Sequence, residues 1–181
     1  MVQIKTERLI LREWKSEDLA PFALVNQDSK VMEYFLSPLT VVETAAMIER
    51  ICEHFMKHGF GLFACTLKET SEFIGFVGLS VPAFETDFTP CVEIGWRLSS
   101  RAWGSGYATE AALAVLKFGF EECKLQEILS WTVPANARSR NVMEKIGLTQ
   151  GGSFDHPKVP EGHPFKSHVL YRMTKKQYES R

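Results

Sequence analysis

The spacing of hydrophobic and polar residues predicts a chain that passes repeatedly between strands and helices. Apolar residues that alternate with polar ones indicate half-buried strands, and apolar residues that recur every three or four positions indicate amphipathic helices. Glycines, prolines and short polar segments separate these runs. The predicted elements, in chain order, are a strand at 3–12, helices at 16–26 and 40–58, strands at 60–67, 73–80 and 91–98, a helix at 107–122, a strand at 128–133, a helix at 136–146, and strands at 148–154 and 168–174.

This order favours an α/β (α+β) fold built on one mixed sheet with helices on its faces. The hairpin across the polar turn 68–72 requires antiparallel pairing, whereas the strand–helix–strand unit at 91–133 requires a parallel pair. Ser16 is expected to cap the first helix, and Gly147 is expected to end the helix at 136–146. A length of 181 residues suits a single domain, which we expect to span residues 1–181.

Composition and charge exclude several classes of protein. Hydrophobic residues make up 45% and charged residues 24%, unlike collagenous, coiled-coil or disordered chains. The 21 Lys and Arg nearly balance the 22 Asp and Glu, so the chain has no overall field to hold a nucleic acid or an anionic membrane. No secretory leader and no stretch of about 18 apolar residues is evident, so we expect a cytoplasmic protein that binds any anion locally.

Neither a disulfide framework nor a metal site is expected. The cysteines stand far apart without the spacing of zinc or redox motifs, so they are expected to be free thiols. They are Cys52, Cys65, Cys91 and Cys123. His156, His163 and His168 lie close in sequence, but two of them precede proline and none has the HxxxH spacing of a helical zinc site.

The most specific local motif is the turn Arg101-Ala102-Trp103-Gly104-Ser105-Gly106-Tyr107-Ala108, which enters a strongly apolar helix. The first N–H groups of a helix have no internal partner, and glycines at 104 and 106 would let a phosphate reach them. The turn has no lysine and is therefore not a Walker A loop. Thr109 stands where a dinucleotide fingerprint needs its third glycine. A plain helix-entry turn is the remaining alternative.

Four segments together resemble the GNAT superfamily of acyl-CoA-dependent N-acetyltransferases, and within it the RimJ/RimL branch that acetylates ribosomal protein N-termini. The segments are Thr6–Arg12, Glu93–Trp96, Trp103–Ala111 and Asn136–Gly147. The resemblance covers nearly the whole chain and implies a GNAT fold, a mixed and mostly antiparallel sheet whose central parallel strands are splayed, with acetyl-CoA as co-substrate. The residues that it implies for binding acetyl-CoA are Ile94, Gly95, Arg101, Trp103, Gly104, Ser105, Gly106, Tyr107, Ala108 and Asn136.

In this family the pantetheine arm lies between the splayed strands, which directs attention to the strand at 91–98. Alternation puts Glu93 on the face opposite the apolar set, so the resemblance implies that it looks into the cleft and acts as general base for an amine. A solvated or paired strand glutamate is the alternative, although Arg97 is roughly 13 Å away at strand rise. Gly95 within a strand favours a bulge or a close approach by a ligand.

The helix that begins at Asn136 carries the second group of candidates. Asn136 is expected to cap this helix, and the resemblance adds a hydrogen bond to the pantetheine arm. Many family members carry a tyrosine seven residues later as general acid for the leaving thiolate, but the residue here is Met143. Ser139 matches a serine that the RimJ/RimL branch places near the CoA sulfur, so it becomes the candidate acid. An ordinary polar residue in the first turn is the alternative.

The acceptor pocket is expected to form between two loops. The segment Asp155–Phe165 resembles a tail of related acetyltransferases and brings in His163, while Tyr34 and Phe35 would line the opposite wall or pack in the core. The resemblance implies direct acetyl transfer to a primary amine in a ternary complex. A protein N-terminal α-amine, a small-molecule amine (polyamine, amino sugar or amino acid) and a non-catalytic acyl-CoA-binding module stay open, as does a monomer or a homodimer.

Overall fold

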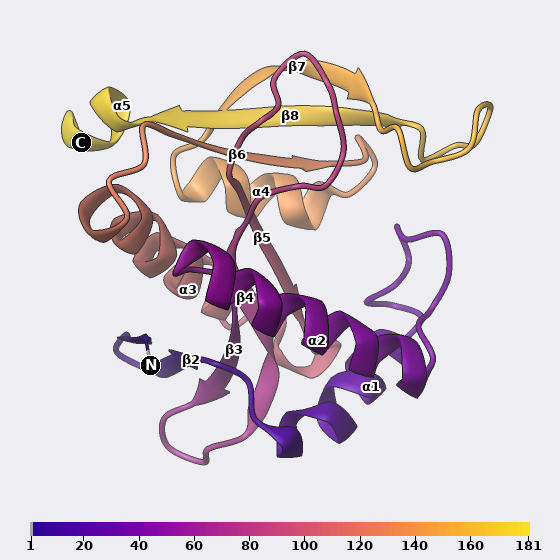
Figure 1. The fold of residues 1–181 in the computed structure, drawn as a ribbon, viewed down its shortest axis with the longest axis vertical. Coiled ribbons are helices and arrows are strands. Elements are labelled where there is room, and N and C mark those ends of the chain that lie inside the picture. The colour runs from indigo at the N-terminus through magenta and orange to yellow at the C-terminus, as the bar shows by residue number, and fades with distance from the viewer. Residues whose placement is uncertain (1) are drawn as a thin grey trace.

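A mixed sheet of eight strands forms the centre of the computed structural model, which describes residues 2–181. The strands are β1 (Gln3–Lys5), β2 (Leu9–Arg12), β3 (Leu62–Leu67), β4 (Phe73–Ser80), β5 (Glu93–Leu98), β6 (Glu127–Thr132), β7 (Thr149–Asp155) and β8 (Ser167–Thr174). The helices are α1 (Leu19–Gln27), α2 (Val41–His58), α3 (Tyr107–Lys117), α4 (Ala137–Lys145) and α5 (Lys175–Glu179). Figure 1 shows β6–β8 with α4 and α5 in one part of the molecule, and β2–β4 with α1 and α2 in the other.

The sheet opens at its centre. Its strand order is β1-β2-β3-β4-β5-β6-β8-β7, and every neighbouring pair is antiparallel except β5 and β6. These two parallel strands register only at Glu93 and Leu129, after which they diverge. Beyond this point the Ser130 hydroxyl donates to the Ile94 carbonyl at 2.9 Å. The mixed sheet with splayed parallel strands confirms the predicted fold class.

The prediction of one strand over residues 3–12 is wrong, because β1 and β2 form a separate antiparallel hairpin. The turn between them is held by α3: the Glu110 carboxylate accepts from the Thr6 hydroxyl at 2.6 Å and from the Arg8 N–H at 2.8 Å. The Arg8 guanidinium completes the tie with an ion pair to Glu110 at 2.6 Å. The contacts of Thr6 and Arg8 with Glu110, about a hundred residues away in sequence, thus break the strand that the local alternation predicted.

The assignment of Ser16 as an N-cap is also wrong. Ser16–Asp18 is a 3-10 turn preceded by Lys15, and α1 follows it. Asp18 precedes α1 without a side-chain cap bond to it. Its buried carboxylate instead closes the 3-10 turn by accepting from the Lys15 N–H at 2.8 Å, and pairs with Arg12 at 2.7 Å. The expected helix at 107–122 ends as α3 at Lys117 and continues as a π-helical turn, while α5 was not expected.

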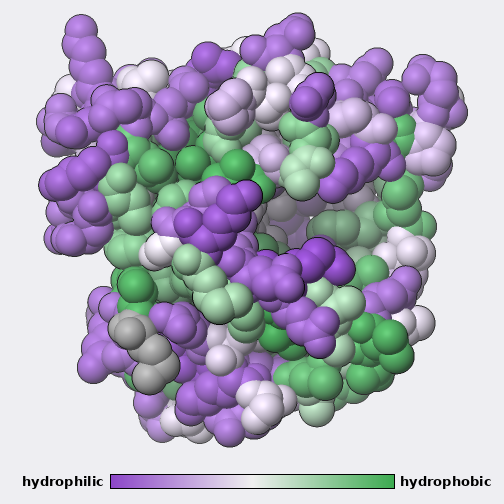
Figure 2. Space-filling view, viewed as in Figure 1, coloured by the Kyte–Doolittle hydropathy of each residue, from purple (hydrophilic) through white to green (hydrophobic). Residues whose placement is uncertain are grey.

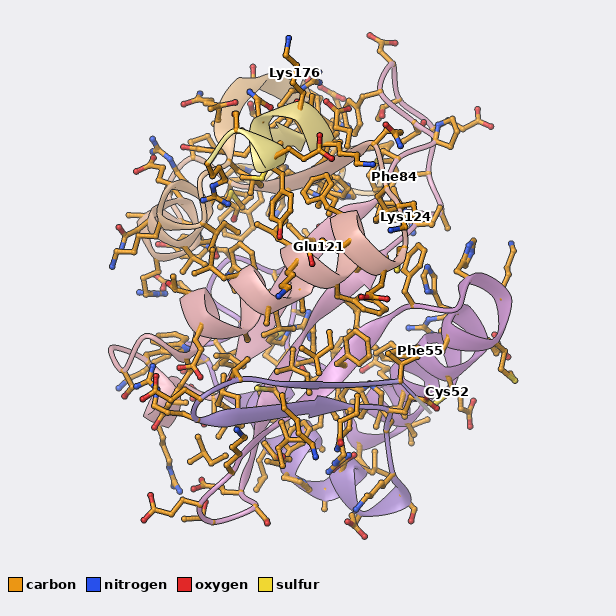
Figure 3. All side chains as sticks on the ribbon, turned by 90° about the vertical axis from the view of Figure 1, so that its left-hand side faces the viewer. Cys52, Phe55, Phe84, Glu121, Lys124 and Lys176 are labelled. Carbon is orange, nitrogen blue, oxygen red and sulfur yellow. The ribbon has the colours of Figure 1, made fainter. Side chains whose placement is uncertain are left out.

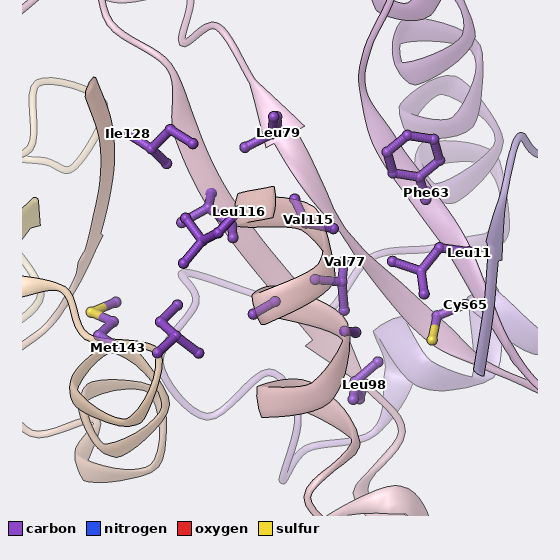
Figure 4. Packing of buried hydrophobic residues seen from close by; sticks show 14 of the residues in the cluster. Leu11, Phe63, Cys65, Val77, Leu79, Leu98, Val115, Leu116, Ile128 and Met143 are labelled. Atoms are coloured by element: carbon purple, nitrogen blue, oxygen red, sulfur yellow. The ribbon is translucent and has the colours of Figure 1, made fainter. Parts of the chain in front are cut away.

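Two layers of apolar side chains cover the two faces of the sheet. On one face Val77 and Leu79 pack with Val115 and Leu116 of α3 (Figure 4), and Ile94 belongs to the same cluster. On the other face Phe22 of α1 packs edge-on against Phe76 of β4, with ring centroids 5.8 Å apart. Because strand residues alternate between faces, β5 carries Ile94 and Leu98 in the α3 layer and leaves Glu93, Gly95 and Arg97 on the face of α1.

Candidate functional site

A cleft of about 790 Å³ lies where β5 and β6 diverge. Its walls come from β5, β6, the start of α3, α4, the loop after α1 and the loop between β7 and β8. Figure 2 shows the surface hollowed between the two parts of the molecule seen in Figure 1. A volume in this range suits a small molecule or a cofactor arm.

The glycine turn forms one end of the cleft. Gly104 and Gly106 both have positive φ, +78° and +82°, which glycine adopts without steric cost. A Cβ at Gly104 would meet nothing within 4 Å, and one at Gly106 would meet only Arg8 Nη2 at 3.5 Å. The space in front of the first N–H groups of α3 is therefore open to an anion such as a phosphate.

Arg8 holds this turn in place from the opposite end of the chain. Its Nη1 donates to the Ser105 carbonyl at 2.9 Å, and its guanidinium lies 4.6 Å from the centre of the Tyr107 ring. Glu110, in the first turn of α3, anchors Arg8 through the ion pair described above. The N-terminal hairpin is thus part of the scaffold of the anion site.

Glu93 faces the cleft at the registered pairing of β5 with Leu129 of β6. Ser80, opposite it on β4, donates its hydroxyl to Glu93 Oε2 at 3.5 Å, the one hydrogen bond of this carboxyl group within residues 2–181. Burial raises the pKa of Glu93 from 4.5 to about 8, and the weak Ser80 contact lowers it only partly. The carboxyl group is therefore set to exchange a proton near neutral pH, as a general base requires.

The backbone beside Glu93 is bare. Gly95 lies two residues further along the same face, and a Cβ placed there would meet only Glu93 Oε1 at 3.9 Å. Ile94 is buried, with its carbonyl turned to Ser130. A ligand can therefore approach the main chain of β5 closely at Gly95.

Asn136 caps α4, as predicted. Its Oδ1 accepts from the Ser139 N–H at 3.2 Å, and its Nδ2 donates to Thr132 Oγ1 at 3.0 Å, which ties the helix to the end of β6. Both Asn136 and Ser139 line the cleft. The Ser139 hydroxyl makes no hydrogen bond with any described residue, so it is free to bind a ligand.

Met143 lies at the boundary between cleft and core. Its side chain is 1% exposed and joins the apolar cluster from α4, as Figure 4 shows. We expect Met143→Ala to lower the free energy of unfolding by about 2–5 kcal/mol, because it removes buried methylene groups and leaves a cavity. Urea unfolding would measure this, with Met56→Ala, whose side chain is 81% exposed on α2, as the control that changes stability little. Equal effects of the two substitutions would contradict the buried role of Met143.

The loop after α1 closes one side of the cleft with aromatic side chains. Tyr34 and Phe35 both line the cleft, and Tyr34 meets Phe165 of the β7–β8 loop at 6.2 Å between ring centroids. Glu33 of the same loop forms a 2.6 Å ion pair with Arg138 of α4, whose guanidinium also lies 4.5 Å from the centre of the Trp103 ring. Four segments far apart in sequence therefore meet around the cleft.

Three of the predicted site residues do not line the cleft. Arg101 is exposed on the 3-10 turn Ser100–Ala102, and Ser105 is exposed with its carbonyl bound to Arg8. His163 accepts the Phe165 N–H at 3.1 Å within its own loop. Their roles stay predictions. The other predicted residues are placed around the cleft: Tyr34, Phe35, Glu93, Ile94, Gly95, Trp103, Gly104, Gly106, Tyr107, Ala108, Asn136 and Ser139.

Two histidines that were not assigned to the pocket lie near the β7–β8 loop: His156 at its start and His168 on β8. His156 and His168 line the cleft with their ring centroids 5.0 Å apart, and Trp131 lines the same cleft. Phe84, from the loop before β5, packs on His156 at 4.8 Å (Figure 3). Burial lowers the pKa of His156 to about 4, so the ring is neutral near pH 7. No periodic pattern in the sequence could show that His156 of this irregular loop points inward and His163 does not.

The cysteines are free, as expected, and none of them lines the cleft in the described chain. Burial raises the pKa of Cys65 to about 12 and that of Cys91 to about 11, which disfavours the thiolate needed for a covalent intermediate. Cys52 lies exposed on α2 (Figure 3). Among residues 2–181, no group of three His, Cys, Asp or Glu side chains is placed to hold a metal ion. Every helix in that part of the chain is too short or too polar to span a membrane.

Comparison with known proteins identifies this architecture. The family model described as acetyltransferase (GNAT) domain matches residues 8–149. The uncharacterized N-acetyltransferase YnaD of Bacillus subtilis is 28% identical over 181 residues, covering 98% of this chain and 99% of YnaD. The crystal structure of a GNAT-family acetyltransferase from Bacillus anthracis has a TM-score of 0.80 at 28% identity, covering 97% of this chain and 99% of that one. Mycobacterium smegmatis RimJ, solved in complex with CoA-disulfide, shares the fold at a TM-score of 0.77 and 20% identity, covering 97% of this chain and 88% of RimJ.

Proposed function

This chain belongs to the GNAT family of acyl-CoA-dependent N-acetyltransferases, and from that premise we propose that it transfers acetyl directly from acetyl-CoA to a primary amine beside Glu93. The observation that carries the proposal is the Glu93 carboxyl group, which faces the cleft at the divergence of β5 and β6 with a pKa of about 8. Membership of the family supports an enzyme that uses acetyl-CoA. The direct route and the roles of individual residues are the proposed part.

The cleft fits acetyl-CoA at two places. The open space at Gly104 and Gly106 before the N-terminus of α3 suits the pyrophosphate, and the gap between β5 and β6 suits the extended pantetheine arm. Acetyl-CoA supplies an activated acetyl thioester when bound. Trp103, Tyr107 and Asn136 line the same cleft.

Glu93 acts on the amine. An amine with a pKa near 8 for a chain terminus or about 10.4 for lysine is mostly protonated at pH 7 and must lose a proton before attack. The carboxylate of Glu93 takes this proton, directly or through one water in the cleft. Since Ser80 is its one hydrogen-bond partner among the described residues, little is lost when the carboxylate turns to an incoming ammonium group.

Ser139 assists the departure of the thiolate, and the size of its effect can be bounded. A CoA thiol resembles cysteine, with a pKa of about 8.5, which is about 1.5 units above neutrality. At about 1.36 kcal/mol per unit, proton donation lowers the barrier by at most about 2 kcal/mol, or roughly 30-fold. A weak hydroxyl acid therefore suffices where Met143 replaces the tyrosine of other members.

We accordingly expect Ser139→Ala to lower kcat by about 3- to 30-fold with nearly unchanged affinity for acetyl-CoA. Steady-state kinetics and a titration of acetyl-CoA would measure the two quantities, with the exposed strand residue Ser153→Ala as the matched control. A thousandfold loss with normal binding would show a much stronger acid than proposed. No loss at all would transfer the role to water.

The acceptor is a primary amine, and the resemblance to the RimJ/RimL branch makes a protein or peptide α-amine the first class to test. Small-molecule amines are the second class. An acceptor screen over peptides, polyamines, amino sugars and amino acids, read out by release of the CoA thiol, separates these classes. If no acceptor in the screen causes release of the CoA thiol, the result would favour the non-catalytic acyl-CoA-binding module and contradict the proposed function.

A further inference from the structure

Arg97 is a cationic side chain in the cleft that the proposed chemistry does not use. It lies on β5 opposite Phe76 of β4, on the same face of the strand as Gly95 and Glu93, and it lines the cleft. Its Cα is four residues from that of Glu93, or roughly 13 Å along the strand. Gly95 lies between them and leaves the floor of the cleft bare.

The partners of Arg97 are neutral. Nη1 donates to Asn26 Oδ1 at 2.7 Å and lies 3.9 Å from the Met47 sulfur. The guanidinium carbon lies 4.3 Å from the centre of the Phe35 ring, and Nε is buried without any hydrogen-bond partner. Burial lowers the pKa of Arg97 to about 10, so the group stays charged at neutral pH at a cost in free energy.

Other arginines of the chain show how unusual this arrangement is. Arg12 pairs with Asp18 at 2.7 Å, and Arg172, whose Nε is also buried and unpartnered, has Glu127 at 3.5 Å. Within residues 2–181, no carboxylate lies within 4.0 Å of Arg97. A buried guanidinium without a counter-charge is costly to the protein alone and becomes favourable when a ligand brings the anion.

We infer that Arg97 binds a carboxylate of the acceptor, so that the enzyme prefers amines that also carry an acid. The acceptor then lies over Gly95 with its amine at Glu93 and its carboxylate toward Arg97. Phe35 and Asn26 hold the guanidinium in position, and the N–H donors along its planar edge match the two oxygens of a carboxylate. This inference rests on the proposed function and adds the substrate class.

The experiment compares matched acceptors that differ only in charge. In the first set, β-alanine, 4-aminobutyrate and 6-aminohexanoate are each compared with their amides. In the second set, the dipeptide Ala-Asp is compared with Ala-Asn, both with an amidated C-terminus. We expect the wild-type enzyme to favour the acid by roughly 10- to 100-fold in kcat/KM in at least one pair. In Arg97→Met the ratio should fall toward one, and in Arg97→Lys it should fall partly. Arg172→Met is the matched control and should keep the wild-type ratio.

If the enzyme prefers the acid over the amide in the amino-acid set, the carboxylate belongs to a small acceptor. If it prefers Ala-Asp over Ala-Asn, the carboxylate belongs to an acidic side chain of a peptide. Either preference supports the inference. Equal kcat/KM within every pair would overturn it while leaving acetyl transfer itself established. A thermal-shift titration with the same acid and amide pairs, in the presence of acetyl-CoA, tests binding without turnover. If no acceptor is acetylated, the proposed function fails. The inference is then still supported if the acids, and not their amides, raise the unfolding temperature of the wild type and this effect is lost in Arg97→Met. Absence of that stabilisation, or loss of acetyl-CoA binding in a folded Arg97→Met, would contradict it.

Discussion

Glu93→Gln is expected to lower kcat/KM by about 10²- to 10⁴-fold at pH 7. Glutamine keeps the shape of the side chain and can still contact Ser80, but it cannot accept a proton from the amine. Glu127→Gln, a strand glutamate outside the cleft, is the matched control and should change activity little. A loss of less than about threefold would leave Glu93 as an ordinary strand residue.

The pH dependence sharpens this prediction. Because the pKa of Glu93 is raised to about 8, the fraction of carboxylate, and with it kcat/KM, should rise as the pH increases through that value. The variant should lack the part of this rise that comes from the carboxylate and keep only the part that comes from deprotonation of the amine. Its deficit should shrink above the pKa of the acceptor, where the amine is already free and needs no base.

The stability of the same variant separates a lost base from a damaged fold. The folded-state pKa of Glu93 lies above its ordinary value of 4.5, so ionisation of the carboxyl group disfavours the folded protein. The wild type therefore loses stability between about pH 4.5 and pH 8, and glutamine does not titrate. We expect Glu93→Gln to unfold at the same temperature as wild type near pH 4, below the ordinary pKa of 4.5, and at a higher temperature near pH 9. An inactive variant that is less stable at pH 9 would contradict this assignment.

Gly106→Val is expected to weaken acetyl-CoA binding by at least about 100-fold, because its side chain would fill the space proposed for the pyrophosphate. The new Cβ would lie 3.5 Å from Arg8 Nη2, an ordinary contact, so the fold has room for it. The φ of +82° adds a cost in stability of roughly 1–2 kcal/mol or more for a β-branched residue.

Because of this strain, the control must be another glycine with a similar positive φ. Gly59 has a φ of +74°, nothing within 4 Å of a Cβ, and a place at the end of α2 outside the cleft. Gly59→Val should lose a similar amount of stability and keep its affinity for acetyl-CoA, as measured by titration calorimetry on the folded variants. Equal affinities in Gly106→Val and the wild type would remove the pyrophosphate from this turn.

The sequence predicted those features that are set by local spacing. Thr40 lies at the start of α2 as the helical pattern required, with Glu43 completing a capping box, and Asn136 caps α4. The alternation along β5 correctly put Glu93 and the apolar residues on opposite faces. Each of these follows from a period or a cap within a few residues.

Features set by distant contacts could not be predicted. The hairpin of β1 and β2 depends on Glu110, and the histidines that line the cleft are His156 of the last loop and His168 of β8 instead of His163. Alternation did place Arg97 on the face of Glu93, but only the packing of α1 and its following loop shows that it is buried without a carboxylate. The signal in the sequence that could have identified Arg97 as a cleft residue is its position on the same strand face as the candidate base Glu93.

Direct acetyl transfer in this cleft is tested most directly by a single-turnover experiment. Enzyme in excess over acetyl-CoA is mixed with an amine, and the acetyl group of the acetyl-CoA carries a label. The free CoA thiol, the acetylated amine and any acetyl group on the protein are followed together. Direct attack assisted by Glu93 predicts that thiol and acetylated amine form at one rate, that the protein carries no acetyl group at any time, and that Glu93→Gln slows both products equally. Acetyl on the protein before it reaches the amine, or thiol release without an acetylated amine, would contradict it.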